Sequence, residues 1–331
     1  MRKAETAIIG PDAAGLAECA AILRGGGLVA FPTETVYGLG ADARNGRAVA
    51  AIFEAKERPK FNPLIVHLTD VDASRRFVEF NEPALALARA FWPGPLTLVL
   101  PRRPDTGLSD LVSAELPTLA VRAPGGETAQ SLLRAFGGPV AAPSANPSGR
   151  ISPTTADQVA AAMTGRIDAV LDGGACPVGL ESTIIGFSGR SPVLLRPGGL
   201  PVEEIEACLG APVGTDAGTE VSAPGQLSSH YAPSVALRLD ARAAGDGEAW
   251  LGFGADPSPL PELSRNLSEA GDLREAAANL FSHLAYLDAQ AAGRGVTRIA
   301  VAVIPETGLG CAINDRLRRA AAPRSGAAAL R

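Results

Sequence analysis

The sequence predicts an α/β protein: a twisted mixed sheet with helices, followed by a long linker and a smaller Rossmann-like α/β domain. Short apolar runs alternate with segments of helical periodicity along most of the 331 residues. Several runs follow one another with no helix between them, which favours a mixed sheet over a purely doubly wound one. Periodicity stops over 211–234, where Gly, Pro, Ser and Thr dominate. We expect domains over 1–210 and 235–323, a linker over 211–234 and a frayed tail over 324–331.

The first domain opens with a helix, a strand and a second helix. Residues 12–24 have helical periodicity, and Gly25–Gly27 end that helix before an apolar strand over 28–31. Asn45 can cap the next helix, which must end near Pro59 because the residue before a proline avoids the helical region. Further strands are predicted over 64–68, 96–100, 119–122, 140–142, 169–171, 182–187 and 193–195, and further helices over 83–91, 127–136, 154–163 and after Pro201.

Two helices and three strands are predicted for the second domain. The strands cover 235–239, 250–253 and 298–304, and the helices cover 272–289 and 311–321.

Composition sets limits on the function. Hydrophobic residues make up 46% and charged residues 20% of the chain, as in a compact globular protein. The net charge of −5 provides no domain-wide basic surface for nucleic acid, although a local patch remains possible. The N-terminus lacks the apolar core of a signal peptide, and no run of about 18 apolar residues occurs, so we expect a cytoplasmic protein without a membrane span. The cysteines stand far apart, which favours reduced thiols over disulfides or a zinc site: Cys19, Cys176, Cys208 and Cys311.

A cationic cluster lies where the second helix should end. Lys56 and Lys60, two of the three lysines of the chain, flank Arg58 in the segment KERPKFNPLIVH. Such a cluster suits an anionic ligand, above all a polyphosphate. The alternative is a helix C-terminus whose basic residues complement the helix dipole.

A second polar segment, PSANPSGRISPT, follows the apolar strand over 140–142. Ser144, Asn146, Ser148 and Ser152 offer short side chains on a proline-bracketed loop that can face phosphate oxygens or a bound magnesium. An ordinary turn is the alternative.

Single polar residues lie at the ends of other predicted strands. Arg122 and Arg196 each need a partner, either a structural carboxylate or a carboxylate or phosphate of a ligand. Thr33 follows a strand in FPTET, where a hydroxyl can bind a ligand or simply satisfy a turn. His67 and Ser182 can each be a satisfied core group instead of a ligand contact.

Several known signatures are absent from the sequence. It has no GxxxxGK[ST], GxSxG or HExxH motif, and with three histidines a multi-histidine metal site is nearly excluded.

His230 and Tyr231 fall inside the linker, where they can be spacers or part of a lid.

In combination, these segments resemble the YrdC-like threonylcarbamoyl-AMP synthase family in its long, two-domain form. FPTETVYGLG, KxRPxxNPLIVH, WPGPLTLVL, VRxP, PSANxSGxxSPT, GxESTI and LLRPG occur in order over 31–198. APGQLSSHYAP is similar to the family's linker, although the family more often has Lys or Arg after its Gly-Met step. The C-terminal LGFG and GLGCAINDRLRRAA are similar to its second domain.

The resemblance implies a reaction and its participants. L-threonine, bicarbonate or CO2, and ATP would give L-threonylcarbamoyladenylate and pyrophosphate, the first step in forming threonylcarbamoyladenosine next to the anticodon of tRNA. A downstream tRNA threonylcarbamoyltransferase complex would be the partner. Mg²⁺ would arrive with the ATP phosphates, without a metal site built from side chains alone.

The resemblance also implies site residues. The first domain would be the catalytic, YrdC-like one, and the linker would close over its site. The catalytic grip on the triphosphate would be Lys56, Arg58, Ser144 and Asn146. Further ATP contacts would be Asn62, Thr118, Ser152, Arg196, His230 and Tyr231. The threonine pocket would be Thr33, His67, Arg122, Ala142 and Ser182, with Arg122 meeting the threonine carboxylate.

Two other functions are compatible with parts of this pattern. An RNA-binding module would show salt-sensitive RNA binding without ATP turnover, which the acidic balance argues against as the main role, leaving weak RNA binding possible. A carbamoyl-adenylate activity like that of hydrogenase maturation proteins would be accompanied by acylphosphatase and zinc-finger segments, and the sequence shows neither.

Overall fold

The computed structural model describes residues 5–215 and 230–323. Contacts divide the chain into two compact units. The first consists of Met1–Ser148, Pro153–Pro177 and Glu181–Gln226, and the second of Gly149–Ser152, Val178–Leu180 and Leu227–Arg331. Of the predicted linker, residues 216–229 lie outside the described residues, as does the predicted tail over 324–331.

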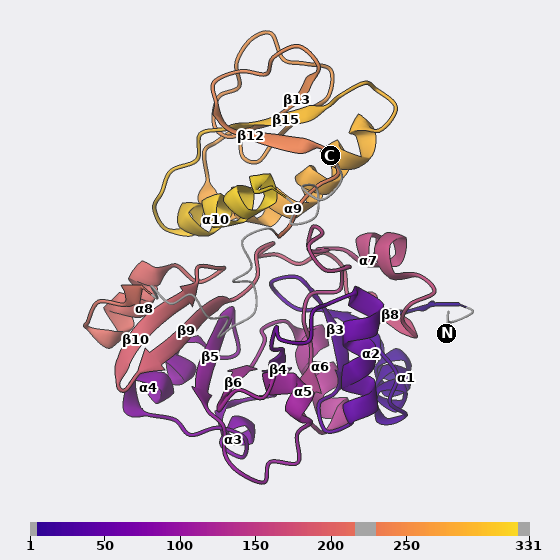
Figure 1. The fold of residues 1–331 in the computed structure, drawn as a ribbon, viewed down its shortest axis with the longest axis vertical. Coiled ribbons are helices and arrows are strands. Elements are labelled where there is room, and N and C mark those ends of the chain that lie inside the picture. The colour runs from indigo at the N-terminus through magenta and orange to yellow at the C-terminus, as the bar shows by residue number, and fades with distance from the viewer. Residues whose placement is uncertain (1–4, 216–229, 324–331) are drawn as a thin grey trace, which may run out of the picture. The chain divides into compact units, whose positions relative to one another are not determined.

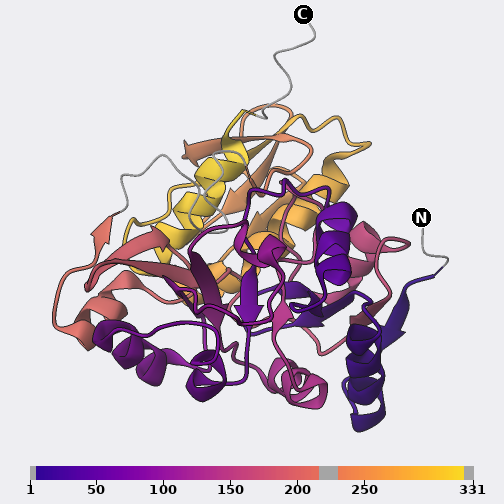
Figure 2. The same cartoon turned by 60° about the horizontal axis from the view of Figure 1, so that its bottom comes forward.

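The first unit is built on an 11-stranded sheet in the order β1-β8-β2-β3-β7-β4-β6-β5-β9-β10-β11, with β1 at one edge. Figures 1 and 2 show this unit from two directions. Parallel pairs such as β4–β6 and β5–β9 alternate with antiparallel pairs such as β2–β3 and β5–β6. The predicted mixed sheet is therefore confirmed. Its strands are β1 (Ala7–Ile9), β2 (Val29–Pro32), β3 (Tyr37–Asp42), β4 (Ile65–His67), β5 (Leu96–Pro101), β6 (Thr118–Arg122), β7 (Val140–Ala141), β8 (Ala169–Leu171), β9 (Thr183–Ser188), β10 (Ser191–Arg196) and β11 (Gly214–Thr215).

Helices cover both faces of this sheet. Residues of α1 and α6 form one hydrophobic core with Val29 and Phe31, while α2, α4 and α7 share another core with Ala30 of the same strand. The alternation along β2 is what a strand buried on two faces requires. The helices are α1 (Ala13–Arg24), α2 (Gly46–Lys56), α3 (Val71–Ser74), α4 (Glu82–Phe91), α5 (Asp110–Ser113), α6 (Glu127–Phe136), α7 (Ala156–Met163) and α8 (Val202–Leu209).

Helix α2 matters most for the site, and its ends are fixed locally. The side chain of Asn45 accepts hydrogen bonds from the backbone N–H groups of Arg47 and Ala48, as predicted for its cap. At the other end Glu57 adopts the left-handed conformation at φ 54°, and the N–H of Arg58 donates to the carbonyl of Phe53. This closure turns the chain sharply, so Lys56 ends the helix and Arg58 begins the loop.

Strand β3 was not predicted, because its glycines weaken the strand pattern. The ring of Phe31 explains Gly40, because an ideal Cβ there would lie 2.9 Å from that ring; an ideal Cβ on Gly38 would lie 3.3 Å from the Cβ of Ala142. Because both strand positions lack side chains, Phe31 extends across β3 and meets His67 of β4 edge to face, with centroids 6.2 Å apart.

The second unit has a four-stranded, all-parallel sheet in the order β12-β15-β13-β14, with helices α9 and α10 packed together and against it (Figure 1). The smaller Rossmann-like α/β domain is therefore confirmed. Its elements are β12 (Ala236–Ala241), β13 (Glu248–Gly252), β14 (Ser264–Asn266), α9 (Leu273–Ala291), β15 (Arg298–Ala302) and α10 (Leu309–Ala321). Only the three-residue β14 was missing from the prediction. No helix in the described part of the chain is long and apolar enough to span a membrane.

Candidate functional site

The cationic exit of α2 and the serine–asparagine turn meet directly. The ammonium Nζ of Lys56 donates to the carbonyl oxygens of Ser144 and Asn146, both at 2.5 Å. In return the N–H of Ser148 donates to the carbonyl of Lys56 at 2.7 Å. Two segments about 90 residues apart in sequence thus form one structure, with Lys56 buried between them.

The electrostatics of this junction favour an anion. The pKa of Lys56 lies well below its usual range, first because burial disfavours the ammonium and then because Arg58 is close. Glu181 acts in the opposite direction. A polyphosphate beside Lys56 and Arg58 would restore the charged form of the lysine, so binding would be coupled to its protonation.

Arg58 shapes the loop that carries Asn62. Its guanidinium donates to the carbonyls of Asn62 at 3.3 Å and Pro63 at 2.9 Å. The side chain of Asn62 is fully buried, yet neither its Nδ2 nor its Oδ1 has a hydrogen-bond partner among the described residues. Leaving a buried polar group unpaired costs about 1–3 kcal/mol. An unpaired buried amide of this kind is therefore typical of a site where a ligand provides the hydrogen-bond partner.

A buried ion pair lies in the part of the site predicted for threonine. The Nη2 of Arg122 is 2.7 Å from Oε1 of Glu34, and Arg122 is also held through its Nε by the carbonyl of Gly94 at 3.2 Å. The two charged groups are close, but Nη2 and Oε1 are not aligned for a hydrogen bond. Arg122 thus pairs with a carboxylate of the protein, at the charge that a ligand carboxylate would use.

His67 lies beside Arg122, its register partner between β4 and β6. Burial first, and then the charge of Arg122, lower the pKa of His67 to about 3. The imidazole is therefore neutral in the folded protein, with Nδ1 3.2 Å from the carbonyl of Ile65. A neutral imidazole can take part in hydrogen bonding without adding charge to the pocket.

Thr33 forms the local turn that was the alternative interpretation. Its hydroxyl donates to the carbonyl of Val36 at 2.7 Å, lies 2.7 Å from the hydroxyl of Thr35, and accepts from the N–H of Thr35 at 3.1 Å. The turn presents the next residue, Glu34, toward Arg122. A contact from Thr33 to threonine stays a prediction.

Ser182 and Arg196 are joined at the neighbouring strands β9 and β10. Arg196 donates through Nε and Nη2 to the carbonyl of Ser182 at 3.2 and 2.8 Å, and the Ser182 hydroxyl lies 2.7 Å from that of Thr97. Gly198 permits this arrangement, because an ideal Cβ there would lie 2.4 Å from the backbone of residues 181–183. Ser182 directly follows Glu181, which connects this cluster electrostatically to Lys56.

Two further predicted site residues lie at strand ends: Ala142 directly follows β7, and Thr118 is the first residue of β6. The N–H of Ala142 donates to the carbonyl of Ile65 at 2.9 Å, just before the turn that carries Ser144. Thr118 begins β6 four residues before Arg122, so about 13 Å of strand separates the two. Because β4 and β6 are parallel, this places Thr118 beside the Asn62 loop that leads into β4.

The other three predicted ATP contacts belong to the second unit. By its contacts Ser152 is grouped there, and it is fully buried. Tyr231 is 1% exposed and stacks on Phe281 of α9 with centroids 5.4 Å apart, under the guanidinium of Arg316. The N–H of His230 donates to the carbonyl of Arg319. The aromatic pair is thus anchored on α9 and α10.

Sequence reasoning assigned no role to three residues that the structure places at the site. Glu34 lies inside the quoted FPTET motif and Glu181 inside GxESTI, so each could have been noticed as a carboxylate beside a predicted site residue. Cys176 gave no such signal. Burial raises the pKa of its thiol to about 12, with Glu34 and Arg122 among the neighbouring charges, so the thiol stays protonated.

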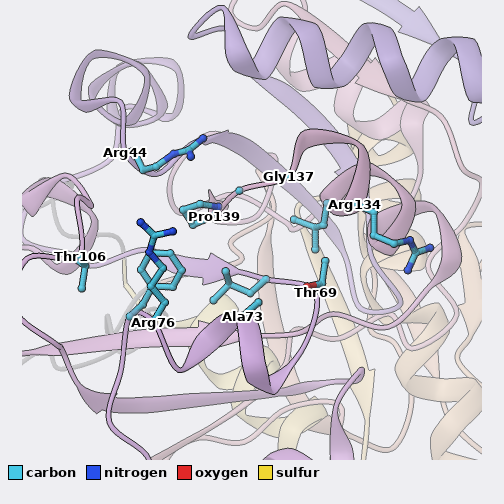
Figure 3. Close-up of a pocket in the computed structure, with 12 residues that line it drawn as sticks. Arg44, Thr69, Ala73, Arg76, Thr106, Arg134, Gly137 and Pro139 are labelled. Carbon is cyan, nitrogen blue, oxygen red and sulfur yellow. The ribbon is translucent and has the colours of Figure 1, made fainter.

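A separate cavity of about 410 Å³ lies elsewhere in the first unit. Figure 3 shows the side chains of Arg44, Arg76 and Arg134 around it. None of the predicted site residues lines it. Arg44 is held there by a two-point ion pair with Asp42 and faces the ring of Phe136.

Comparison with known proteins identifies the family. Residues 21–198 match a family model described as "Telomere recombination", and residues 200–322 match "Threonylcarbamoyl-AMP synthase, C-terminal domain". The chain is 40% identical to a threonylcarbamoyl-AMP synthase of Bacillus subtilis, covering 93% of each, and 41% identical to one of Pyrococcus abyssi, covering 92% and 93%. A crystal structure of P. abyssi Sua5 complexed with L-threonine superposes with a TM-score of 0.86 at 38% identity, covering 96% of this chain and 98% of that one. The chain therefore belongs to the threonylcarbamoyl-AMP synthase family, and the two models match its successive regions.

Proposed function

We propose that this protein is a threonylcarbamoyl-AMP synthase. It converts L-threonine, bicarbonate or CO2, and ATP into L-threonylcarbamoyladenylate and pyrophosphate, the first step of threonylcarbamoyladenosine formation in tRNA. The observation that carries the proposal is the junction of Lys56 with the turn at Ser144 and Asn146. It joins a cationic loop to a turn rich in short polar side chains, as a triphosphate site requires.

The reaction needs positioning and charge neutralisation more than it needs a strong base. The threonine carbamate attacks the α-phosphorus of ATP and pyrophosphate leaves, so several negative charges are brought together. Lys56 and Arg58 neutralise the triphosphate, and Asn62 supplies the buried amide that the protein leaves unpaired. Arg122 binds the threonine carboxylate beside a neutral His67.

Mg²⁺ accompanies ATP in this proposal. Within the described residues no group of three or more His, Cys, Asp or Glu side chains could hold a metal. The side-chain oxygens of Ser144 and Asn146 suit a hard cation that is mainly bound by phosphate. Mg²⁺ supplies charge neutralisation on the transferring phosphate, while the protein residues orient the chain of phosphates.

The cellular setting belongs to the same proposal. The enzyme would act as an ATP-dependent nucleotidyltransferase in the cytoplasm. Its product, L-threonylcarbamoyladenylate, would pass to a tRNA threonylcarbamoyltransferase complex.

A pyrophosphate-release assay tests the proposal. Release is expected only when ATP, L-threonine and bicarbonate are all present, and each is omitted in turn. Serine in place of threonine should react about 10- to 100-fold less well, since one methyl group in a pocket is worth about 1–3 kcal/mol. Release without threonine, or none with the full mixture, contradicts the proposal.

Variants locate the activity. Arg58→Ala should reduce pyrophosphate release at least about 100-fold, because it removes a charge that meets the transition state. Arg76→Ala removes an exposed arginine from the separate cavity and should leave the rate unchanged, which makes it a matched control. Equal loss in both variants would contradict the location of the site.

A further inference from the structure

The carboxylate of Glu34 is buried without the hydrogen bonds that such a group needs. Glu34 is 9% exposed, and neither Oε1 nor Oε2 has a hydrogen-bond partner among the described residues. An ionised carboxylate has about four acceptor sites. Burying it with only the unaligned ion-pair contact to Arg122 is costly unless something else fills these sites.

The surroundings leave these acceptor sites open. The hydroxyls of Thr33 and Thr35 are close to each other and do not bond Glu34. Gly125 makes the space: an ideal Cβ there would lie 3.1 Å from the carboxyl carbon of Glu34 and 3.2 Å from Oε1. Glycine at position 125 therefore leaves space beside the carboxylate of Glu34.

The charged and titratable groups around Glu34 come from three further elements. Arg122 of β6 is 2.7 Å away, His67 of β4 is Arg122's neutral neighbour, and the protonated thiol of Cys176 lies on the loop after β8. Arg122 is thus the one cation in this set. A second cation in the pocket would be attracted to the unfilled side of the carboxylate.

Threonine itself brings such a cation. It enters with an ammonium group, but its nitrogen can attack bicarbonate only as the free amine. The balance is R–NH3⁺ + HCO3⁻ → R–NH–COO⁻ + H2O + H⁺: one C–N bond forms, one C–O bond breaks with loss of water, and one proton must be accepted. The threonine pocket therefore needs an anion near the nitrogen at first and a proton acceptor afterwards.

We propose that Glu34 is that group: its carboxylate binds the ammonium of threonine and accepts the proton released as the carbamate forms. When threonine binds, its own carboxylate takes over the contact with Arg122, and Glu34 turns its free oxygens to the nitrogen. Once protonated, Glu34 no longer repels the new carbamate. This assignment rests on the proposed function and adds a catalytic residue to it.

A purely structural ion pair is the competing explanation. In the second unit Glu248 shows what that looks like: its oxygens accept from Arg238 at 2.5 and 3.0 Å and from the N–H of Gly245 at 2.8 Å. Glu34 has no comparable set. The difference in hydrogen bonding therefore separates the two roles.

The test is the pH dependence of pyrophosphate release by Glu34→Gln, which keeps the size of the side chain but removes its basicity. At neutral pH we expect kcat to fall about 100-fold, within the range for loss of a general base. The deficit should shrink as pH rises toward the pKa of the threonine amine, because solution then supplies the deprotonated nitrogen. Glu34→Asp retains a base and should keep the pH profile of the unaltered enzyme at a reduced rate.

The following outcomes would overturn the proposal or the proposed function on which it rests. A deficit in Glu34→Gln that is the same at every pH, or no deficit, overturns the proposal. If Glu34→Gln fails to fold, as judged by its thermal transition, Glu34→Asp decides instead: a profile that differs from that of the unaltered enzyme overturns it. Inactivity of the unaltered enzyme with all three substrates would instead overturn the proposed function. Glu248→Gln, a glutamate of an ion pair outside this site, serves as control and should keep the unaltered profile.

Discussion

The glutamates of two glutamate–arginine pairs, one in each unit, have similar burial and opposite hydrogen bonding, while Arg122 is 4% exposed and Arg238 39%. The side chain of Glu34 is 11% exposed beside Arg122, and that of Glu248 is 9% exposed beside Arg238. Glu248 is saturated with donors, and Arg298 lies 3.8 Å from it as well. Glu34 has a cation at 2.7 Å but no aligned donor.

The difference shows how a structural pair can be distinguished from a pair kept for a ligand. Desolvating two charges is offset only when the remaining lone pairs and protons are satisfied. Glu248 meets that condition, and the hydrogen bonds from Arg238 lower its pKa to about 2. Glu34 does not meet it, and the missing donors are those that an ammonium group would bring. We therefore expect substitution of Glu34 to lower turnover and substitution of Glu248 to leave turnover unchanged.

The largest effect should come from Arg122→Ala. It leaves the buried charge of Glu34 without compensation, which costs about 3–5 kcal/mol of unfolding free energy, and it removes the group proposed for the threonine carboxylate. Urea unfolding and threonine-dependent pyrophosphate release measure the two losses. Adding Glu34→Gln to Arg122→Ala should restore part of the stability but none of the activity. If the double variant is no more stable than the single one, the two side chains are not coupled.

A smaller effect is expected from Glu248→Gln in the second unit. It weakens charge-assisted hydrogen bonds from Arg238, whose side chain is 39% exposed and screened by solvent, so the unfolding free energy should fall by less than in Arg122→Ala. The kcat of the folded variant should stay unchanged. A large loss of kcat without loss of stability would mean that this pair also serves the reaction.

The pH dependence of stability sharpens the same contrast. The pKa of Glu248 is depressed in the fold to about 2 from an ordinary 4.5, so its contribution is fully present above pH 4.5 and is lost as pH falls toward 2. The stability difference between the unaltered protein and Glu248→Gln should therefore be constant above pH 5 and shrink in acid. Unfolding curves at a series of pH values check this; a difference that grows in acid would contradict it.

The smallest effect is expected from Arg44→Lys at the separate cavity. Lysine cannot form the two-point contact that the partly exposed side chain of Arg44 makes with Asp42. Exposed ion pairs contribute about 0–1 kcal/mol. Thermal unfolding should shift by a few degrees at most, with unchanged pyrophosphate release. A loss of activity here would show that the reaction depends on more than the site described above.

Local patterns in the sequence predicted most of the fold. The helix predicted over 127–136 occupies those residues, and the cap at Asn45 forms as expected. The strand with Gly38 and Gly40 escaped prediction because its glycines weaken the strand pattern, while the Phe31 ring that packs against Gly40 is a tertiary contact. Local periodicity cannot report such a contact.

The site was predictable where residues of one chemistry were clustered in a motif. The convergence of the Lys56 loop with the Ser144 turn is confirmed by two hydrogen bonds. The pairing of Glu34 with Arg122 was not predictable from the residues alone, because it joins the turn after β2 to the end of β6 across the fold. Nor could the sequence show that the Thr33 hydroxyl is used within its own turn.

Stability and turnover, measured together on Glu34→Gln and Glu248→Gln, test the central claim most directly. We predict that Glu34→Gln lowers kcat about 100-fold, and that it also lowers the unfolding free energy because the buried Arg122 loses its counter-charge. Glu248→Gln should lower stability while kcat stays unchanged. If Glu34→Gln loses stability as Glu248→Gln does and keeps its turnover, both pairs are structural and the account is contradicted.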